Sequence, residues 1–178
     1  MQTKTELYNL SLAQWQSWSL AALFTLGNIL LPQLCHLLPQ GGLIFLPIYF
    51  FTLVGAYKYG WKVGLLIAVA SPLINHLLFG MPPANALTVL LAKSTVLAIV
   101  ASVVATKWQK ATLPLLLLVV VGYQLIGGAI EALITGSATA PLQDWQLGWP
   151  GLLLQVVAGW WVIRRMPNEG KDKNFTAV

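Results

Sequence analysis

The sequence predicts an all-α membrane protein: one domain over residues 1–178, six transmembrane helices, and both termini in the cytoplasm. Hydrophobic residues make up 57% of the chain and charged residues only 8%, against about 25% charged residues in soluble domains. The uncharged runs at residues 7–57, 63–92 and 111–130 reach the roughly 20 apolar residues that cross about 30 Å of hydrocarbon. The positions of the basic residues agree with this topology.

Turn-forming and charged residues divide the apolar sequence into spans. The sequence "PQGG" at residues 39–42 separates the first two spans, and "GMPPAN" at residues 80–85 separates the third from the fourth. The second span is short for a crossing. We expect no cleavable signal peptide, because the start is polar and no small-residue cleavage site follows the first apolar run. The predicted spans are 15–38, 42–57, 61–80, 86–106, 112–136 and 147–164.

The basic residues predict the orientation. With a cytoplasmic N-terminus, the three outer loops contain no Lys or Arg, and basic loops stay in the cytoplasm during insertion. Basic loops beside anionic lipid also account for the net charge of +5 without any nucleic-acid partner. Nine of the ten basic residues then lie on cytoplasmic segments: Lys4, Lys58, Lys62, Lys107, Lys110, Arg164, Arg165, Lys171 and Lys173.

Polar residues gather in the outer half of the predicted bundle. At 1.5 Å per residue, Lys93 lies about 10 Å and Glu131 about 8 Å below the outer ends of their spans, so they can pair. We therefore expect an outward-facing polar pocket, with Trp149 at its mouth able to stack on a ligand. The candidate substrate-binding residues are Asn75, His76, Lys93, Tyr123, Gln124, Glu131, Trp149 and Gln155.

Structural explanations remain open for the same residues. A charge inside a span costs about 2.5–3.5 kcal/mol on insertion scales, so Lys93 and Glu131 should face protein or water. Their pair could simply join two helices. His76 could be satisfied by Asn75 or by a backbone carbonyl.

Small residues recur every four positions on the first predicted span. Such a stripe lets helix backbones approach closely, either within this chain or against another membrane protein. The residues of this stripe are Ala13, Ser17, Ala21 and Thr25.

The sequence contains no recognisable enzyme motif. It has no H-E-x-x-H, no G-x-S-x-G and no P-loop, so we expect no catalytic residues and no ATP coupling by the chain itself. The single Cys35 excludes an internal disulfide and a multi-cysteine metal site. We therefore expect no metal and no cofactor.

The segment from Gly42 to Pro83, "GLIFLPIYFFTLVGAYKYGWKVGLLIAVASPLINHLLFGMPP", resembles the substrate-binding S components of energy-coupling-factor (ECF) transporters. Similar S components show a Gly, then Leu-Pro, a Gly-rich hairpin, Ser-Pro-Leu and Gly-Met-Pro-Pro. The stripe from Ala13 to Thr25 resembles the small-residue face by which such proteins dock on their coupling subunit, although the usual pair of alanines is missing.

This resemblance implies a six-helix protein of the bacterial cell (inner or plasma) membrane that captures a vitamin or other micronutrient at its outer side. It implies a lid at about residues 37–42. It also implies three partner subunits, namely a transmembrane coupling subunit and two ATPase subunits that hydrolyse ATP in place of this chain, which is not expected to be an enzyme.

The substrate class stays open at the sequence level. Lys93 suits a carboxylate or phosphate, and Glu131 suits an amine or a protonated ring nitrogen. A vitamin or vitamin precursor with a heteroaromatic ring is the leading hypothesis. One alternative is a corrinoid-type S component that works without the coupling module, with His76 near cobalt. Others are a membrane enzyme using His76 and Glu131 as an acid–base pair, and a scaffold protein without a ligand.

Overall fold

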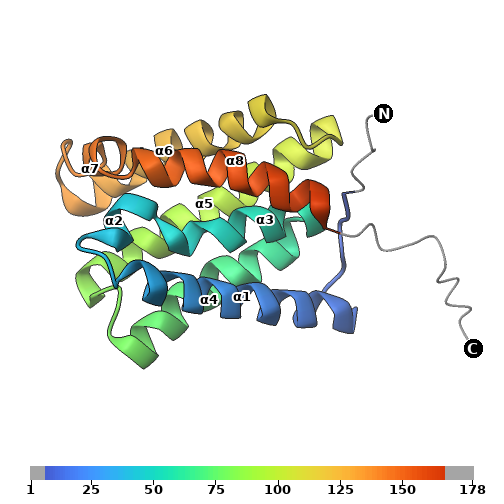
Figure 1. The fold of residues 1–178 in the computed structure, drawn as a ribbon, viewed down its shortest axis with the longest axis horizontal. Helices are drawn as coiled ribbons and strands as arrows, with labels where there is room; N and C mark the ends of the chain where they lie inside the picture. The colour runs from blue at the N-terminus through green and yellow to red at the C-terminus, as the bar shows by residue number, and fades with distance from the viewer. Residues whose placement is uncertain (1–6, 167–178) are drawn as a thin grey trace, which may run out of the picture.

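The computed structural model describes residues 7–166, and all regular elements in this part of the chain are helical (Figure 1). The predicted all-α class is therefore confirmed. Lys4, Lys171 and Lys173 lie outside the described residues. The elements are α1 (Trp15–Cys35), α2 (Gly41–Phe45), the 3-10 helix η1 (Pro47–Tyr49), α3 (Phe50–Tyr59), α4 (Trp61–Phe79), α5 (Ala84–Trp108), α6 (Leu113–Thr135), α7 (Leu142–Gln146) and α8 (Trp149–Arg165).

Four helices are long and apolar enough to cross a membrane: α1, α4, α5 and α6, with 21, 19, 25 and 23 residues. They correspond to four of the six predicted spans. The predicted sixth span corresponds to α8, which has 17 residues. Leucine side chains on the outer faces of the long helices are exposed, among them Leu23, Leu77, Leu125 and Leu133. Such faces suit a lipid environment.

The predicted second span, 42–57, is not one helix, which corrects that prediction. It is divided into α2, η1 and α3, and Leu46 between the first two has a left-handed backbone with φ of 46°. Pro47 follows, and its missing N–H and fixed φ favour the start of a new helix. The break leaves backbone groups of the first turn of α3 without intrahelical partners.

Asn28 of α1 satisfies one of these groups. The backbone N–H of Phe51 donates to Asn28 Oδ1 at 3.1 Å, while Asn28 Nδ2 donates to Thr52 Oγ1 at 3.0 Å and to Ser71 Oγ at 3.2 Å. Asn75 Nδ2 donates to the backbone carbonyl of Asn28 at 3.0 Å. One buried amide therefore ties α1, α3 and α4 together where the second span is broken, as irregular backbone in an apolar environment requires.

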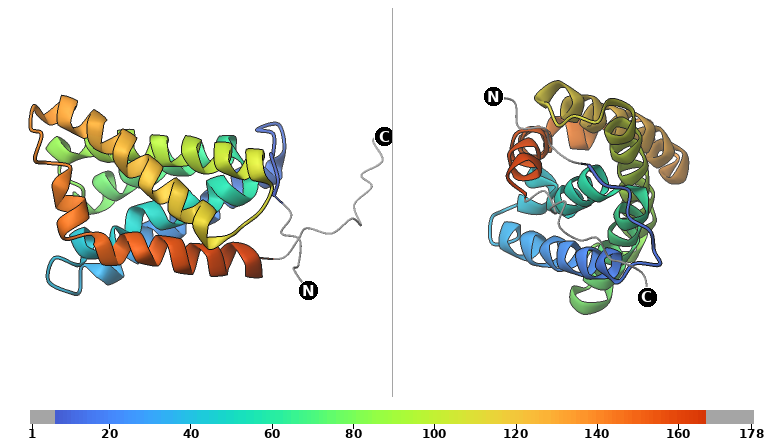
Figure 2. Two further views of the ribbon diagram at one scale, coloured as in Figure 1. Left: turned by 90° about the horizontal axis from the view of Figure 1, so that it is seen from above. Right: turned by 90° about the vertical axis from the view of Figure 1, so that its right-hand side faces the viewer.

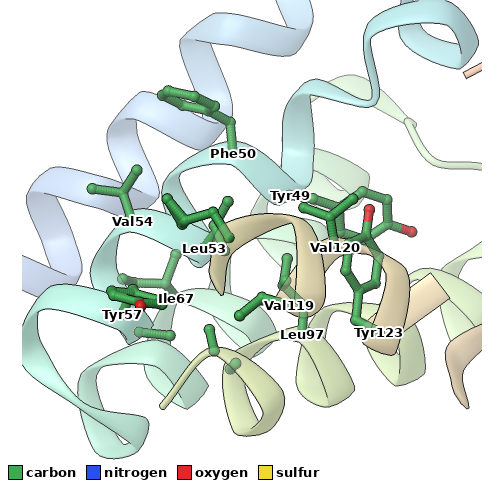
Figure 3. Packing of buried hydrophobic residues seen from close by; sticks show 14 of the residues in the cluster. Tyr49, Phe50, Leu53, Val54, Tyr57, Ile67, Leu97, Val119, Val120 and Tyr123 are labelled. Atoms are coloured by element: carbon green, nitrogen blue, oxygen red, sulfur yellow. The ribbon is translucent and has the colours of Figure 1, made fainter. Parts of the chain in front are cut away.

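Helix α3 forms the centre of the bundle. It contacts α1, α4, α5 and α8, and in Figure 2 it lies inside the ring made by the longer helices. Its Leu53, Val54 and Tyr57 are fully buried. Figure 3 shows them beside Ile67 of α4 and Leu97 of α5. A short, enclosed α3 explains why its sequence is apolar on all sides rather than amphipathic.

Small residues allow the close packing of α4 on α3. A methyl group added to Gly64 would lie 2.5 Å from Cβ of Ala56 and 3.2 Å from Cβ of Ala98, so only glycine fits between the three helices. The stripe predicted on α1 has the same role. Ser17, Ala21 and Thr25 are buried in the chain, while Ala13 is exposed in the turn before the helix. Its helical part faces the interior, which fits the alternative of internal packing, and docking on a partner stays a prediction.

The two ends of the bundle differ in charge. At one end the hydroxyl of Tyr57 donates to the carbonyl of Lys110 at 2.6 Å, and the N–H of Tyr8 donates to the carbonyl of Lys58 at 2.8 Å. These contacts bring the start of the described chain to the α3–α4 and α5–α6 connections, and α8 ends on the same side (Figure 1). The described basic residues at this end are Lys58, Lys62, Lys107, Lys110, Arg164 and Arg165.

Candidate functional site

A cavity of about 530 Å³ opens at the other end of the bundle. Its walls come from the end of α1, α2, η1, Asn75 of α4, the α4–α5 connection, α5, α6 and the short helix α7. Figures 1 and 2 show α2 and α7 together at this end, away from the basic end. A volume of this size lies within the range of small-molecule sites.

Three charged side chains from three helices meet in the wall of this cavity. Lys93 Nζ of α5 lies 2.5 Å from Glu131 Oε2 of α6 and 2.8 Å from Asp144 Oδ2 of α7. Gln124 Nε2 also donates to Asp144 Oδ2, at 3.3 Å. A methyl group at Gly127 of α6 would lie 2.9 Å from Cγ of Lys93, so this glycine leaves room for the lysine side chain.

The three charges differ in their access to the cavity. The side chain of Lys93 is 3% exposed, whereas those of Glu131 and Asp144 are 16% and 17% exposed. The ammonium group is therefore covered by its two carboxylate partners, and the carboxylates form the more accessible surface. Among the described residues of the cavity wall, these three are the only acidic or strongly basic side chains.

Asn75 contributes an unpaired acceptor to the same cavity. Its Nδ2 donates to the carbonyls of Asn28 and Ser71, at 3.0 and 2.9 Å. Because both partners can only accept, these contacts fix the orientation of the amide. Asn75 Oδ1 has no hydrogen-bond partner although it is buried. A buried acceptor without a partner is rare in folded proteins and needs an explanation.

A second polar layer lies beneath the cavity. Tyr123 donates from its hydroxyl to Gln155 Oε1 at 3.0 Å, and its ring centroid lies 5.6 Å from that of Tyr49, which lines the cavity. Tyr123, Gln124 and Gln155 are buried and none of them is part of the cavity wall. Of the predicted site residues, the structure therefore brings Asn75, Lys93 and Glu131 to the cavity and places these three behind it.

His76 and Trp149 are outside the cavity wall, which corrects their predicted placement there. His76 Nδ1 lies 2.7 Å from the carbonyl of Pro82, which can only accept, so Nδ1 is the protonated nitrogen. This is the structural alternative for His76, in which the ring ties the end of α4 to the α4–α5 connection. Trp149 is 57% exposed at the start of α8 and does not line the cavity.

Sequence-based reasoning missed Asp144 and the contribution of α2. Asp144 is the only acidic residue between Glu131 and Glu169, and an isolated acid in an otherwise uncharged outer loop was a usable signal. His36 also lines the cavity, together with Gln40 and Gly42 of the predicted lid region at residues 37–42. Nothing in the sequence pattern pointed to His36.

The site contains no recognisable metal-binding group, since residues 7–166 hold no cluster of three or more His, Cys, Asp or Glu that could bind a metal ion. Comparison of the chain with protein-family models, curated proteins and solved structures finds no significant match. The function proposed below is therefore argued from the cavity, from the charge distribution and from the resemblance of residues 42–83.

Proposed function

We propose that this protein is the substrate-capture (S) subunit of an ECF-type importer, and that it binds a vitamin or vitamin precursor in the cavity between α2, α5, α6 and α7. The observation that supports this most is the cavity itself. It is about 530 Å³ in volume, open at one end of an apolar bundle, and contains charged side chains from three helices. Buried ionisable groups in a membrane segment are functional candidates by default.

The proposal includes six spans and a cytoplasmic N-terminus. Helices α1, α4, α5 and α6 provide four spans. The interrupted segment α2–η1–α3 and the 17-residue α8 provide the other two. The separation of the basic end from the cavity end supports this orientation, because basic segments stay in the cytoplasm and the cavity then opens outward.

The proposal also includes its partners. The chain has no P-loop, so uptake against a gradient needs ATPase subunits and a membrane coupling subunit. In this scheme the protein resides in the bacterial cell membrane and works on the substrate without changing it chemically.

The structure gives less support to the alternatives. A membrane enzyme that pairs His76 with Glu131, and a corrinoid carrier that uses His76, both need this imidazole in the cavity. His76 does not line the cavity, and its Nδ1 donates to the carbonyl of Pro82.

The test is ligand retention by purified protein. Protein from cells grown in rich medium is denatured, and the released small molecules are identified by mass spectrometry. We expect a stoichiometric molecule from the wild type. Ala86→Trp, which fills the cavity, should lose it, and Ile99→Trp on the exposed face of the same helix should keep it. Retention by both variants, or a molecule converted to another during incubation, would contradict the proposal.

A further inference from the structure

The formal charge of the cavity is negative. Lys93 contributes +1, and Glu131 and Asp144 contribute −1 each, which gives −1 for the three ionised groups of the wall. The other wall residue of this kind, His36, is exposed to water, where charges are screened. A neutral or anionic occupant would leave this excess negative charge inside the bundle uncompensated.

The positions of the three charged groups are as important as their summed charge. Lys93 is almost inaccessible, while the two carboxylates that contact it are each partly exposed. An anion entering the cavity would meet carboxylate oxygens before the ammonium group. The ammonium group therefore serves to hold the two carboxylates together, because two such groups close together repel each other.

The unpaired buried group of the wall is an acceptor. Asn75 Oδ1 has no hydrogen-bond donor, and the amide nitrogen of Asn75 is already used twice. Glu131 Oε2 accepts from the ammonium group of Lys93, and the two carboxylates keep further acceptor capacity. A molecule that donates hydrogen bonds therefore matches this part of the wall.

From these observations we infer that the molecule bound in the cavity is a small cation of charge +1 that donates hydrogen bonds, of the class of amines, amidines and protonated amino-heterocycles. The inference rests on the proposed function, because it assumes that the cavity binds a small molecule. Charge-assisted hydrogen bonds from such a cation to Glu131 or Asp144 are stronger than bonds between neutral groups. The inference reverses the sequence-based possibility that Lys93 binds a carboxylate or phosphate.

The first experiment compares ligand classes. A small-molecule extract is separated into a cation-exchange fraction, an anion-exchange fraction and an unretained neutral fraction. Each fraction is incubated with ligand-free protein in lipid nanodiscs, and retained molecules are measured by mass spectrometry. We expect retention from the cation-exchange fraction. Retention only from the anion-exchange or neutral fraction overturns the charge inference and leaves the proposed function standing. No retention from any fraction contradicts the proposed function itself.

The second experiment tests the charge directly, with the cation-exchange fraction as probe. Asp144→Asn brings the cavity charge to zero and should reduce retention at least tenfold. The double variant Lys93→Met, Asp144→Asn returns the charge to −1 and should recover most of this loss. Recovery would not occur if Lys93 were the ligand-binding group, so a double variant weaker than Asp144→Asn overturns the inference.

A conservative variant keeps the test decisive if the double variant does not fold. Asp144→Glu preserves the charge and should retain the cation far better than Asp144→Asn, with thermal unfolding recorded for both. Equal loss in Asp144→Glu and Asp144→Asn would mean that charge is not what the cavity recognises.

Discussion

Lys93 holds two carboxylates that belong to different helices and lie 38 and 51 positions further along the chain. At the scale of single residues this is the unusual feature of the protein, because a lysine that is 2% exposed among apolar helices is tolerated only with partners. Either carboxylate can be lost while Lys93 keeps the other. The reverse is not true, since loss of Lys93 leaves two neighbouring carboxylates without a counter-charge.

This asymmetry predicts the order of stabilities. Lys93→Met should lower the free energy of unfolding by about 3 kcal/mol or more, the range for a broken buried pair. Glu131→Gln and Asp144→Asn should each cost less, because both carboxylates are partly exposed and Lys93 stays paired. Thermal unfolding in detergent at one pH measures all three. A Lys93→Met protein as stable as either carboxylate variant would contradict this account.

Asn28 is the second residue whose contacts hold several helices together. Replacing it with Leu removes one acceptor and two donated hydrogen bonds, and leaves the N–H of Phe51 buried without a partner. Each stranded polar group costs about 1–3 kcal/mol. We expect Asn28→Leu to lower the unfolding temperature much more than Thr52→Val, which removes the bond from Asn28 and a long bond to the carbonyl of Ile48 but leaves the N–H of Phe51 paired. Equal effects in circular-dichroism melts would show that Asn28 does not stabilise the start of α3.

At the scale of elements, helices pack through small residues at two places that bear on function. One is the buried stripe of α1. The other is the start of α8, where Gly148 and Gly151 leave room for the backbone of α2. A side chain at Gly148 would meet the carbonyl of Leu43, and one at Gly151 would overlap the backbone of Phe45. Because α2 contributes Gly42 and Leu43 to the cavity wall, its packing on α8 helps to set the shape of the site.

The stripe of α1 gives a test with neighbouring positions. Ala21→Trp places a large ring at a buried position and should destabilise the fold by about 1–3 kcal/mol through overpacking. Ala22→Trp adds the same ring at an exposed position and should leave stability unchanged. The unfolding temperatures of the two variants test whether the stripe serves internal packing. A loss of uptake in Ala21→Trp with unaltered stability would instead favour a docking role for the stripe.

The start of α8 gives a second matched pair. Gly151→Ala should push α2 away from α8 and weaken retention of the molecule bound by the wild type, because no nearby side chain can move to make space. Gly122→Ala on α6 meets only Cγ1 of Val100, at 3.4 Å, and should be neutral or slightly stabilising. Retention measured by mass spectrometry should fall only in Gly151→Ala. An equal fall in both would exclude a specific role for the α2–α8 contact.

The whole molecule has one basic end and one end with a cavity. Several basic side chains at the first end lie over neighbouring tryptophan rings, for example Lys107 over Trp108 at 4.9 Å and Arg164 over Trp160 at 5.0 Å. Tryptophan and basic residues are both frequent where a helix leaves the membrane. This pattern fits a protein whose two ends face different compartments, with the cavity away from the basic loops.

Cysteine labelling in intact cells tests that orientation. In a Cys35→Ser background, Ala84→Cys at the exposed start of α5 and Ala138→Cys in the α6–α7 connection lie at the cavity end and should react with an impermeant maleimide. Gln109→Cys, exposed in the α5–α6 connection, should react only after the cells are opened. External labelling of Gln109→Cys would reverse the orientation and place the cavity on the cytoplasmic side.

The sequence by itself determined the helical class, four long apolar helices among the six predicted spans, and the position of most basic residues away from Lys93. These follow from composition, hydropathy and charge, which are local along the chain. The similar depths of Lys93 and Glu131 also sufficed to predict their pairing, because depth on a helix depends only on residue count.

Only the tertiary structure decided the rest. The helix is interrupted at Leu46, and Asn28 lies close enough to accept a hydrogen bond from the N–H of Phe51 that follows the interruption. A hydropathy profile contains no information about such a contact. Depth alone placed His76 in the cavity, but the rotation of α4 and the nearby carbonyl of Pro82 direct its ring elsewhere. Asp144 joins Lys93 from a short helix beyond the end of α6. The balance of charge in the cavity depends on which distant side chains meet, and that is fixed by the packing of the helices and not by their order in the sequence.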